Sequence, residues 1–243
     1  MCRRFFVDHP IEGSESWLEG PEAQHLSRVL RAKVGDQIVL FDGSGAEFPA
    51  RIVRMERSRV DLQVLARRPV DRELHPPLVL AVALPKGDRQ RWLVEKAVEL
   101  GVTRLVPLIT QRGVAQPVDK ALERLQRTVA EASKQCGRNR LMEISPPQTL
   151  RDCFTTAPPE YSKWIAHPSS TASRPPQQLL SDSDPRPLLI AIGPEGGFTD
   201  DEVATGGGDC QLVTLGLRIL RIETAALALA SLVSLYRAPQ TES

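Results

Sequence analysis

Two short stretches near the C-terminal end carry the residue types best suited to chemistry. The first, Ile192 to Phe198, reads IGPEGGF, and its glycines let the backbone approach a ligand closely because a Cβ atom there would intrude. The second, Leu215 to Ala230, sets two arginines, a glutamate and a threonine just before an alanine- and leucine-rich helix. Polar groups gathered at a helix start indicate a binding or catalytic site.

Each stretch follows an apolar run that predicts a buried strand, Leu188 to Ile192 and Leu212 to Leu215. In an open parallel sheet, strand-to-turn-to-helix transitions lie at the carboxyl ends of the strands, where ligands bind. The glycine-rich turn alone is equally compatible with a tight turn that only lets a strand enter a helix. It is neither a P-loop, since the Gly-Lys-Ser/Thr ending is missing, nor a G-x-G-x-x-G fingerprint.

The two motifs together, IGPEGGF and LGLRILRIETA, resemble the cofactor loops of SPOUT-class RNA methyltransferases. They are most similar to the ribosomal RNA small subunit methyltransferase E family, which methylates N3 of a uridine in 16S ribosomal RNA. The resemblance covers nearly the whole chain. It implies S-adenosylmethionine as cofactor, 16S ribosomal RNA in the small ribosomal subunit as partner, a homodimer, a C-terminal trefoil knot and no metal. Leu217 departs from the motif, because many relatives have proline there.

The resemblance also implies roles for individual residues. Arg218 and Arg221 would be catalytic, stabilising the uracil oxygens or anchoring phosphate, and Glu223 is a weaker candidate for handling the proton. For Glu195 and Glu223, stabilisation of a helix N-terminus is a competing explanation. The residues expected to bind the cofactor are His167, Ile192, Gly193, Glu195, Gly196, Gly197, Leu215, Gly216, Leu220, Thr224 and Ala225.

Composition is that of a soluble globular protein, with 41% apolar and 25% charged residues among 243. The N-terminus lacks the apolar core of a secretory signal, and the longest nearly apolar run, Ala225 to Tyr236, is too short to span a bilayer. The cysteines are far apart and form no CxxC or Cys/His cluster: Cys2, Cys136, Cys153 and Cys210. We therefore expect a cytoplasmic protein with reduced thiols and no zinc site.

Charge is unevenly distributed although the net charge is only +1. Residues 76–140 hold 12 basic and 6 acidic groups, whereas residues 141–243 hold 7 and 12. A basic middle segment is compatible with phosphate contacts, and a solvated helix surface would give the same count.

Residues 1–74 predict a small β-rich domain. A helix should begin at Pro21 with His25, Leu26, Val29 and Leu30 on one side, His25 being a partly buried packing residue. Strands are expected at 37–41, 47–53 and 59–65, the first two joined by a tight turn at 42–45. The unit resembles a PUA-like RNA-binding β-barrel, which implies phosphate contacts by Arg3, Arg4, Arg28 and Arg31. An ordinary solvated helix face is the alternative for Arg28 and Arg31.

Residues 75–243 predict an α/β domain with a mostly parallel sheet. Strands at 78–84 and 104–109 flank a helix at 89–100, with Asp88 as its N-cap and Gly101 as its left-handed cap. A long amphipathic helix at 118–136 ends in the basic KQCGRNR segment. A strand at 161–166 precedes a loop at 169–187. Similarity to the family implies RNA contacts by Lys86, Arg138 and Arg140.

Two other functions remain compatible with the sequence. One is a noncatalytic RNA-binding ribosome-assembly factor that kept the barrel and the basic helix. The other is a SPOUT methyltransferase acting on transfer RNA.

Overall fold

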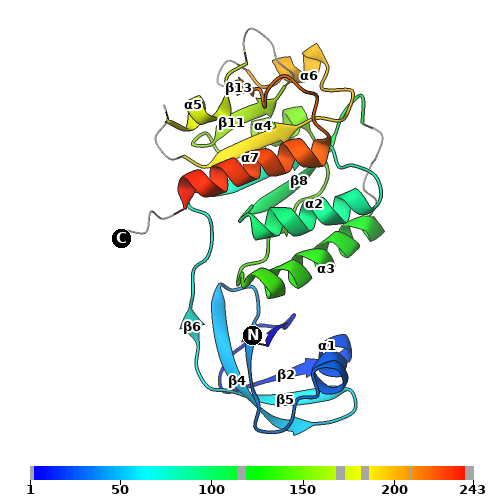
Figure 1. The fold of residues 1–243 in the computed structure, drawn as a ribbon, viewed down its shortest axis with the longest axis vertical. Helices are drawn as coiled ribbons and strands as arrows, with labels where there is room; N and C mark the ends of the chain where they lie inside the picture. The colour runs from blue at the N-terminus through cyan, green and yellow to red at the C-terminus, as the bar shows by residue number, and fades with distance from the viewer. Residues whose placement is uncertain (1–2, 114–118, 168–172, 182–185, 208–209, 239–243) are drawn as a thin grey trace. The chain divides into compact units, whose positions relative to one another are not determined.

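The computed structural model describes residues 3–113, 119–167, 173–181, 186–207 and 210–238, and the chain divides into two compact units (Figure 1). The first unit comprises Met1–Arg72 together with Ser133–Leu141. The second comprises Glu73–Ala132 and Met142–Ser243. A short segment from the middle of the chain therefore belongs to the N-terminal unit.

The N-terminal unit is a curled six-stranded sheet in the order β1-β3-β4-β5-β2, with β6 paired to β4. All pairs are antiparallel except β1 with β3, which is parallel. A register shift between Ile52 and Arg54 interrupts the β4–β5 ladder, and such bulges increase strand twist. The strands are β1 (Arg4–Phe6), β2 (Glu15–Glu19), β3 (Gln37–Phe41), β4 (Ala46–Met55), β5 (Arg59–Val64) and β6 (Arg68–Pro69).

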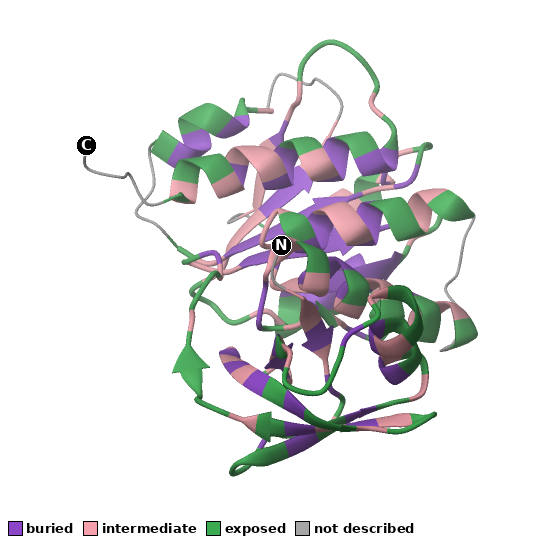
Figure 2. Ribbon diagram, turned by 60° about the horizontal axis from the view of Figure 1, so that its bottom comes forward, coloured by how far each residue is buried: buried purple, intermediate pink, exposed green. Residues whose placement is uncertain are grey.

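Alternate residues of β4 form the core of this sheet, as the period-two pattern predicts. Phe48, Ala50 and Ile52 are all buried, and Figure 2 shows the alternation of buried and exposed positions along the strands. The expected hairpin between β3 and β4 is also present.

The predicted helix at Pro21 has two parts, and one of its faces was predicted wrongly. An α-helical turn, α1 (Gly20–Gln24), continues into a π-helical turn, η1 (His25–Val29). Leu26 is fully buried, but His25 is exposed and Val29 is 65% exposed. The Leu30 amide donates to the His25 carbonyl, five residues back, so these residues depart from the 3.6-residue period on which the prediction depended.

The second unit contains a parallel sheet in the order β10-β8-β7-β12-β11-β13, with β9 paired to β8. Every residue of the central strands β7 and β12 is buried, as expected when helices cover both faces of a parallel sheet. The strands are β7 (Leu78–Val82), β8 (Arg104–Ile109), β9 (Glu143–Ile144), β10 (Gln148–Thr149), β11 (Ser162–Ala166), β12 (Leu188–Ile192) and β13 (Cys210–Val213).

Helices cover the two faces of this sheet. On one face, Leu150 and Phe154 of α4 join Val79 and Ala81 in a buried cluster. The C-terminal helix α7 packs against α2 and across β7 and β12 (Figure 1). The helices are α2 (Asp88–Glu99), α3 (Asp119–Cys136), α4 (Leu150–Thr156), α5 (Pro176–Ser181), α6 (Asp200–Ala204) and α7 (Ile222–Arg237).

Several local expectations for this unit are corrected. The N-cap of α2 is Gly87, not Asp88, which is the first helical residue and still complements the helix dipole. The strand expected at 212–215 is β13, which begins earlier and ends at Val213. Part of the expected loop at 169–187 forms α5. The left-handed conformation predicted after α2 is confirmed at Gly101, and Gly137, which follows α3, also has a positive φ.

In the part of the chain that the structure describes, none of the helices has the length and apolar character needed to cross a membrane.

Candidate functional site

The carboxyl ends of β11, β12 and β13 open onto one cavity of about 270 Å³. Because these strands are parallel neighbours, the loops that follow them converge at the same edge of the sheet. The loops after β12 and β13 and the first turns of α7 supply most of the wall. The lining residues are Ala166, His167, Ile192, Gly193, Pro194, Glu195, Gly196, Gly197, Val213, Thr214, Leu215, Gly216, Arg218, Ile219, Leu220, Ile222 and Ala225.

Most residues expected to bind the cofactor lie in this wall. His167, Ile192, Gly193, Glu195, Gly196, Gly197, Leu215, Gly216, Leu220 and Ala225 all line the cavity, as does Arg218. Thr224 does not line it and is exposed on α7. Arg221 is the N-cap residue of α7, with an exposed side chain that makes no capping hydrogen bond.

Six lining residues were not anticipated: Ala166, Pro194, Val213, Thr214, Ile219 and Ile222. Five of them are next to a residue that was, so extending the motifs by a single position would have found these five; Val213 lies two positions before Leu215.

The turn after β12 is shaped by close packing of its own residues. A Cβ atom on Gly193 would lie 3.0 Å from the ring of Phe198, which is itself buried. Gly197 has φ +71° and donates its amide to the Pro194 carbonyl. Thr199 then caps α6, with Glu202 completing a capping box. The turn therefore has a defined conformation before it meets any ligand.

Two residues that follow β8 hold this turn in place by hydrogen bonds. Arg112 Nη1 donates to the Gly196 carbonyl at 2.8 Å, and the Gln111 amide donates to Glu202 at 2.9 Å. These contacts join residues more than eighty positions apart, so no local sequence pattern predicts them.

The loop between β13 and α7 leaves two large apolar side chains in solvent. Leu217 is 96% exposed and Ile219 is 85% exposed. Gly216, with φ +104°, permits the sharp change of direction before them, and no atom lies within 4 Å of the position that its Cβ would occupy.

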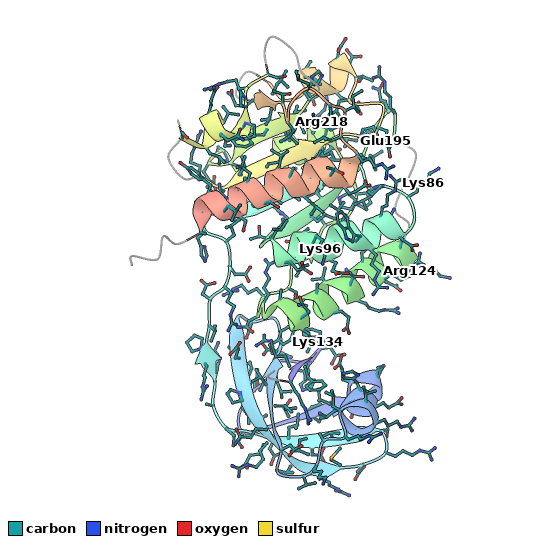
Figure 3. All side chains as sticks on the ribbon, viewed as in Figure 1. Lys86, Lys96, Arg124, Lys134, Glu195 and Arg218 are labelled. Atoms are coloured by element: carbon teal, nitrogen blue, oxygen red, sulfur yellow. The ribbon has the colours of Figure 1, made fainter. Side chains whose placement is uncertain are left out.

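Charged groups meet beside the cavity. Arg89 Nη1, from the first turn of α2, lies 3.7 Å from Glu195 Oε1 and 3.6 Å from Glu223 Oε1. The Glu223 side chain is only 7% exposed, and its Oε2 atom is buried with no hydrogen-bond partner among the described residues. Figure 3 labels Glu195 and Arg218, which come from the two loops near the amino end of α7.

The expected RNA-contacting residues have different environments. Arg28, Arg31, Lys86 and Arg140 are exposed. Arg3 pairs with Asp36 at 3.5 Å.

Two other expected RNA contacts lie inside the first unit. Arg4 is largely buried, pairs with Glu47 and donates to the Gly137 carbonyl and to Asn139 Oδ1. Arg138 is only 3% exposed. The Arg4 side chain is therefore positioned to support the 137–140 loop.

Family comparisons cover both units. Residues 72–234 match the family described as an RNA methyltransferase domain, and residues 18–65 match an RNA methyltransferase PUA domain. The chain is 32% identical to the ribosomal RNA small subunit methyltransferase E of Bacillus subtilis, covering 96% of each chain. It is 34% identical to that of Synechocystis sp., covering 88% of this chain and 71% of the relative. The chain belongs to the ribosomal RNA small subunit methyltransferase E family.

Solved structures share the whole fold. The ribosomal RNA small subunit methyltransferase E of Neisseria gonorrhoeae, solved bound to S-adenosylmethionine, superposes with a TM-score of 0.86 and 32% identity. The match covers 97% of this chain and 98% of that chain. A Legionella pneumophila methyltransferase in complex with the same cofactor gives a TM-score of 0.86 and 31% identity, covering 97% of this chain and 98% of that one.

Proposed function

We propose that this protein transfers the methyl group of S-adenosylmethionine to N3 of a specific uridine in 16S ribosomal RNA of the small ribosomal subunit. The observation that carries the proposal is the cavity at the carboxyl ends of β11, β12 and β13, in a chain whose relatives are named ribosomal RNA small subunit methyltransferase E. Relatives solved with the cofactor support the choice of methyl donor.

The residues present fit this cofactor. A cavity of about 270 Å³ is close to the small end of ligand pockets. Its wall has an apolar side at Ile192, Leu220 and Ile222, suited to an adenine ring, and backbone groups at the glycine-rich turn, suited to polar edges. Gly197 and Gly216 leave open space where side chains would otherwise stand.

S-adenosylmethionine supplies an activated methyl group on a sulfonium centre with a good leaving group. As the N3–methyl bond forms and the sulfur–methyl bond breaks, uridine N3 loses its proton and the cofactor loses its positive charge. The protein therefore has to align the two reactants and accommodate the negative charge that develops on the uracil ring.

Arginines at the start of α7 are suited to the second task. Arg218 lines the cavity and Arg221 projects from the N-cap position of α7, so both can approach a uracil oxygen or the adjoining phosphate. Glu223 is the nearest buried carboxylate, and its unpartnered Oε2 can accept a hydrogen bond or a proton.

We assign RNA binding to the PUA-like unit within residues 1–74 and methyl transfer to residues 75–243. Arg28, Arg31, Lys86 and Arg140 are exposed, so their guanidinium and ammonium groups can reach phosphates, and Arg3 can do so by leaving its partly exposed ion pair. Arg4 would act indirectly by holding the 137–140 loop, in which Arg138 is buried.

Two further features belong to the proposal. The chain passes from β12 to β13 beyond β11 and then returns as α7 across β12 and β7, a path that a trefoil knot would require. The exposed Leu235 and Tyr236 on α7 and Leu217 and Ile219 on the cofactor loop would be covered in a homodimer. Light scattering during gel filtration tests the dimer directly.

The test of the activity is transfer of labelled methyl from S-adenosylmethionine to unmodified small subunits, to free ribosomal RNA and to transfer RNA, with primer extension on the product. A methyl group on N3 blocks the Watson–Crick edge, so a stop at one uridine of the small subunit is expected. Label found in transfer RNA instead would show that the substrate is transfer RNA and not ribosomal RNA. RNA binding without any transfer would favour the assembly factor and refute the proposal.

A further inference from the structure

Arg89 occupies a position that a cation does not favour. It is the second residue of α2, where the positive end of the helix dipole disfavours a guanidinium. Its side chain is 42% exposed, so it has room to extend fully into solvent. It turns instead toward two carboxylates that come from elements far away in the sequence.

Only one of the two carboxylates lines the cavity: Glu195 is part of its wall, whereas Glu223 follows the lining residue Ile222 without being part of the wall. Glu195 lies on the turn that follows β12, and Glu223 lies in the first turn of α7. One nitrogen, Arg89 Nη1, is 3.7 Å from an oxygen of the first and 3.6 Å from an oxygen of the second. Both distances suit an ion pair and are longer than a hydrogen bond, so the guanidinium is shared between the carboxylates.

The burial of Glu223 independently supports a structural role for its ion pair with Arg89. Its side chain is more than nine-tenths buried, and one carboxylate oxygen has no hydrogen-bond partner among the described residues. A buried carboxylate is costly unless it is paired, and Glu223 forms an ion pair with Arg89. Because Arg89 approaches only Oε1, the other oxygen remains available.

We infer that Arg89 is a positioning residue for the methyl-transfer site: it ties the turn at Glu195 to the start of α7 at Glu223 and so fixes the position of the turn relative to the helix. This inference rests on the proposed function. Arg89 contacts neither reactant and acts through the two carboxylates. Arg112, which holds Gly196 from the other side of the same turn, completes the support.

The test is calorimetric titration of S-adenosylmethionine into the full-length protein, without RNA. Arg89→Gln keeps the length and polarity of the side chain but removes its charge. The loss of two partly exposed ion pairs should weaken cofactor affinity about five- to tenfold. Arg89→Lys should restore most of the affinity. Arg91→Gln, an equal change at an exposed position on the same helix, should leave the affinity unchanged.

A double-mutant cycle separates positioning from a general loss of stability. If Arg89 acts through Glu223, which does not line the cavity, then Arg89→Gln combined with Glu223→Gln should weaken binding no further than Arg89→Gln alone. The effect should also shrink at high salt, as an ion-pair contribution must. Hydrogen exchange of residues 193–198 should accelerate in Arg89→Gln and remain at the native rate in Arg91→Gln.

Unchanged affinity in Arg89→Gln, or an equal loss in Arg91→Gln, would overturn the inference. If Arg89→Gln does not fold, Glu223→Gln alone decides: weaker binding supports the tie, and native affinity refutes it. A wild-type protein that binds no S-adenosylmethionine would overturn the proposed function itself. If the wild-type protein binds the cofactor and Arg89→Gln binds it equally well, only the positioning role is overturned.

Discussion

Replacing Glu47 by glutamine should loosen the N-terminal unit in a pH-dependent way. Glu47 Oε1 accepts hydrogen bonds from Arg4 and, at 2.7 Å, from Arg72, and its side chain is 15% exposed. Burial by itself would raise the pKa of this carboxyl, but the hydrogen bonds and charges of Arg72 and Arg4 outweigh it, so the pKa lies below its usual value.

The size of the effect follows from these contacts. Charge-assisted hydrogen bonds contribute about 1.5–3 kcal/mol each, and a glutamine oxygen would still accept one at reduced strength. We expect a net destabilisation of about 2 kcal/mol at neutral pH. Because a group with a depressed pKa stabilises the fold above its ordinary value and loses that contribution as pH falls, the difference should vanish in acid.

Hydrogen exchange of peptides from β3 and β4 measures this locally. A destabilisation of about 2 kcal/mol corresponds to roughly thirtyfold faster exchange near pH 7. The difference in exchange rate between the variant and the wild-type protein should narrow below pH 4.5, the ordinary pKa of a glutamate. The control is Glu56→Gln, whose pair with Arg54 is exposed on both sides and should contribute little. A Glu47→Gln effect of the same size at every pH would refute the electrostatic reasoning.

Three further predictions concern the second unit. Gly197→Val should abolish cofactor binding in a folded protein, because φ is +71° and a side chain would enter the cavity; unchanged calorimetric affinity would remove that turn from the site. Arg221→Ala should lose most methyl transfer and keep cofactor affinity, and equal loss of both would exclude a catalytic role. Burial raises the pKa of the Cys153 thiol to about 11, so alkylation near pH 8 should be at least tenfold slower in the native than in the unfolded protein; equal rates by mass spectrometry would contradict that burial.

Continuous apolar runs made the central strands of the second unit predictable. β7 and β12 are buried at every residue, so their sequences carry an unbroken signal. β2 was missed because one of its two inward positions is Ser16, which hides the alternation although the residue is buried. β9 and β10 have two residues each and lie below the length of any pattern.

The lining of the cavity was largely predictable because it follows two contiguous motifs. The exception is Thr224, which the motif includes but which α7 turns outward, although its neighbours Ile222, Glu223, Ala225 and Ala226 are all buried. The contacts that hold the site, from Arg89 and Arg112, could not be predicted. They join positions far apart in the sequence, and only the folded sheet brings them together.

Because residues 133–141 belong to the N-terminal unit, that unit cannot complete its contacts until this later segment has been synthesised. The Asn139 amide donates to the Val70 carbonyl, 69 residues earlier, and its oxygen accepts from Arg4. A ribosome adding about 5–20 residues each second needs roughly 3–14 s to pass from one to the other. During that interval β7, α2, β8 and all of α3 are synthesised. The first unit to emerge therefore waits for part of the second before its own last contacts can form.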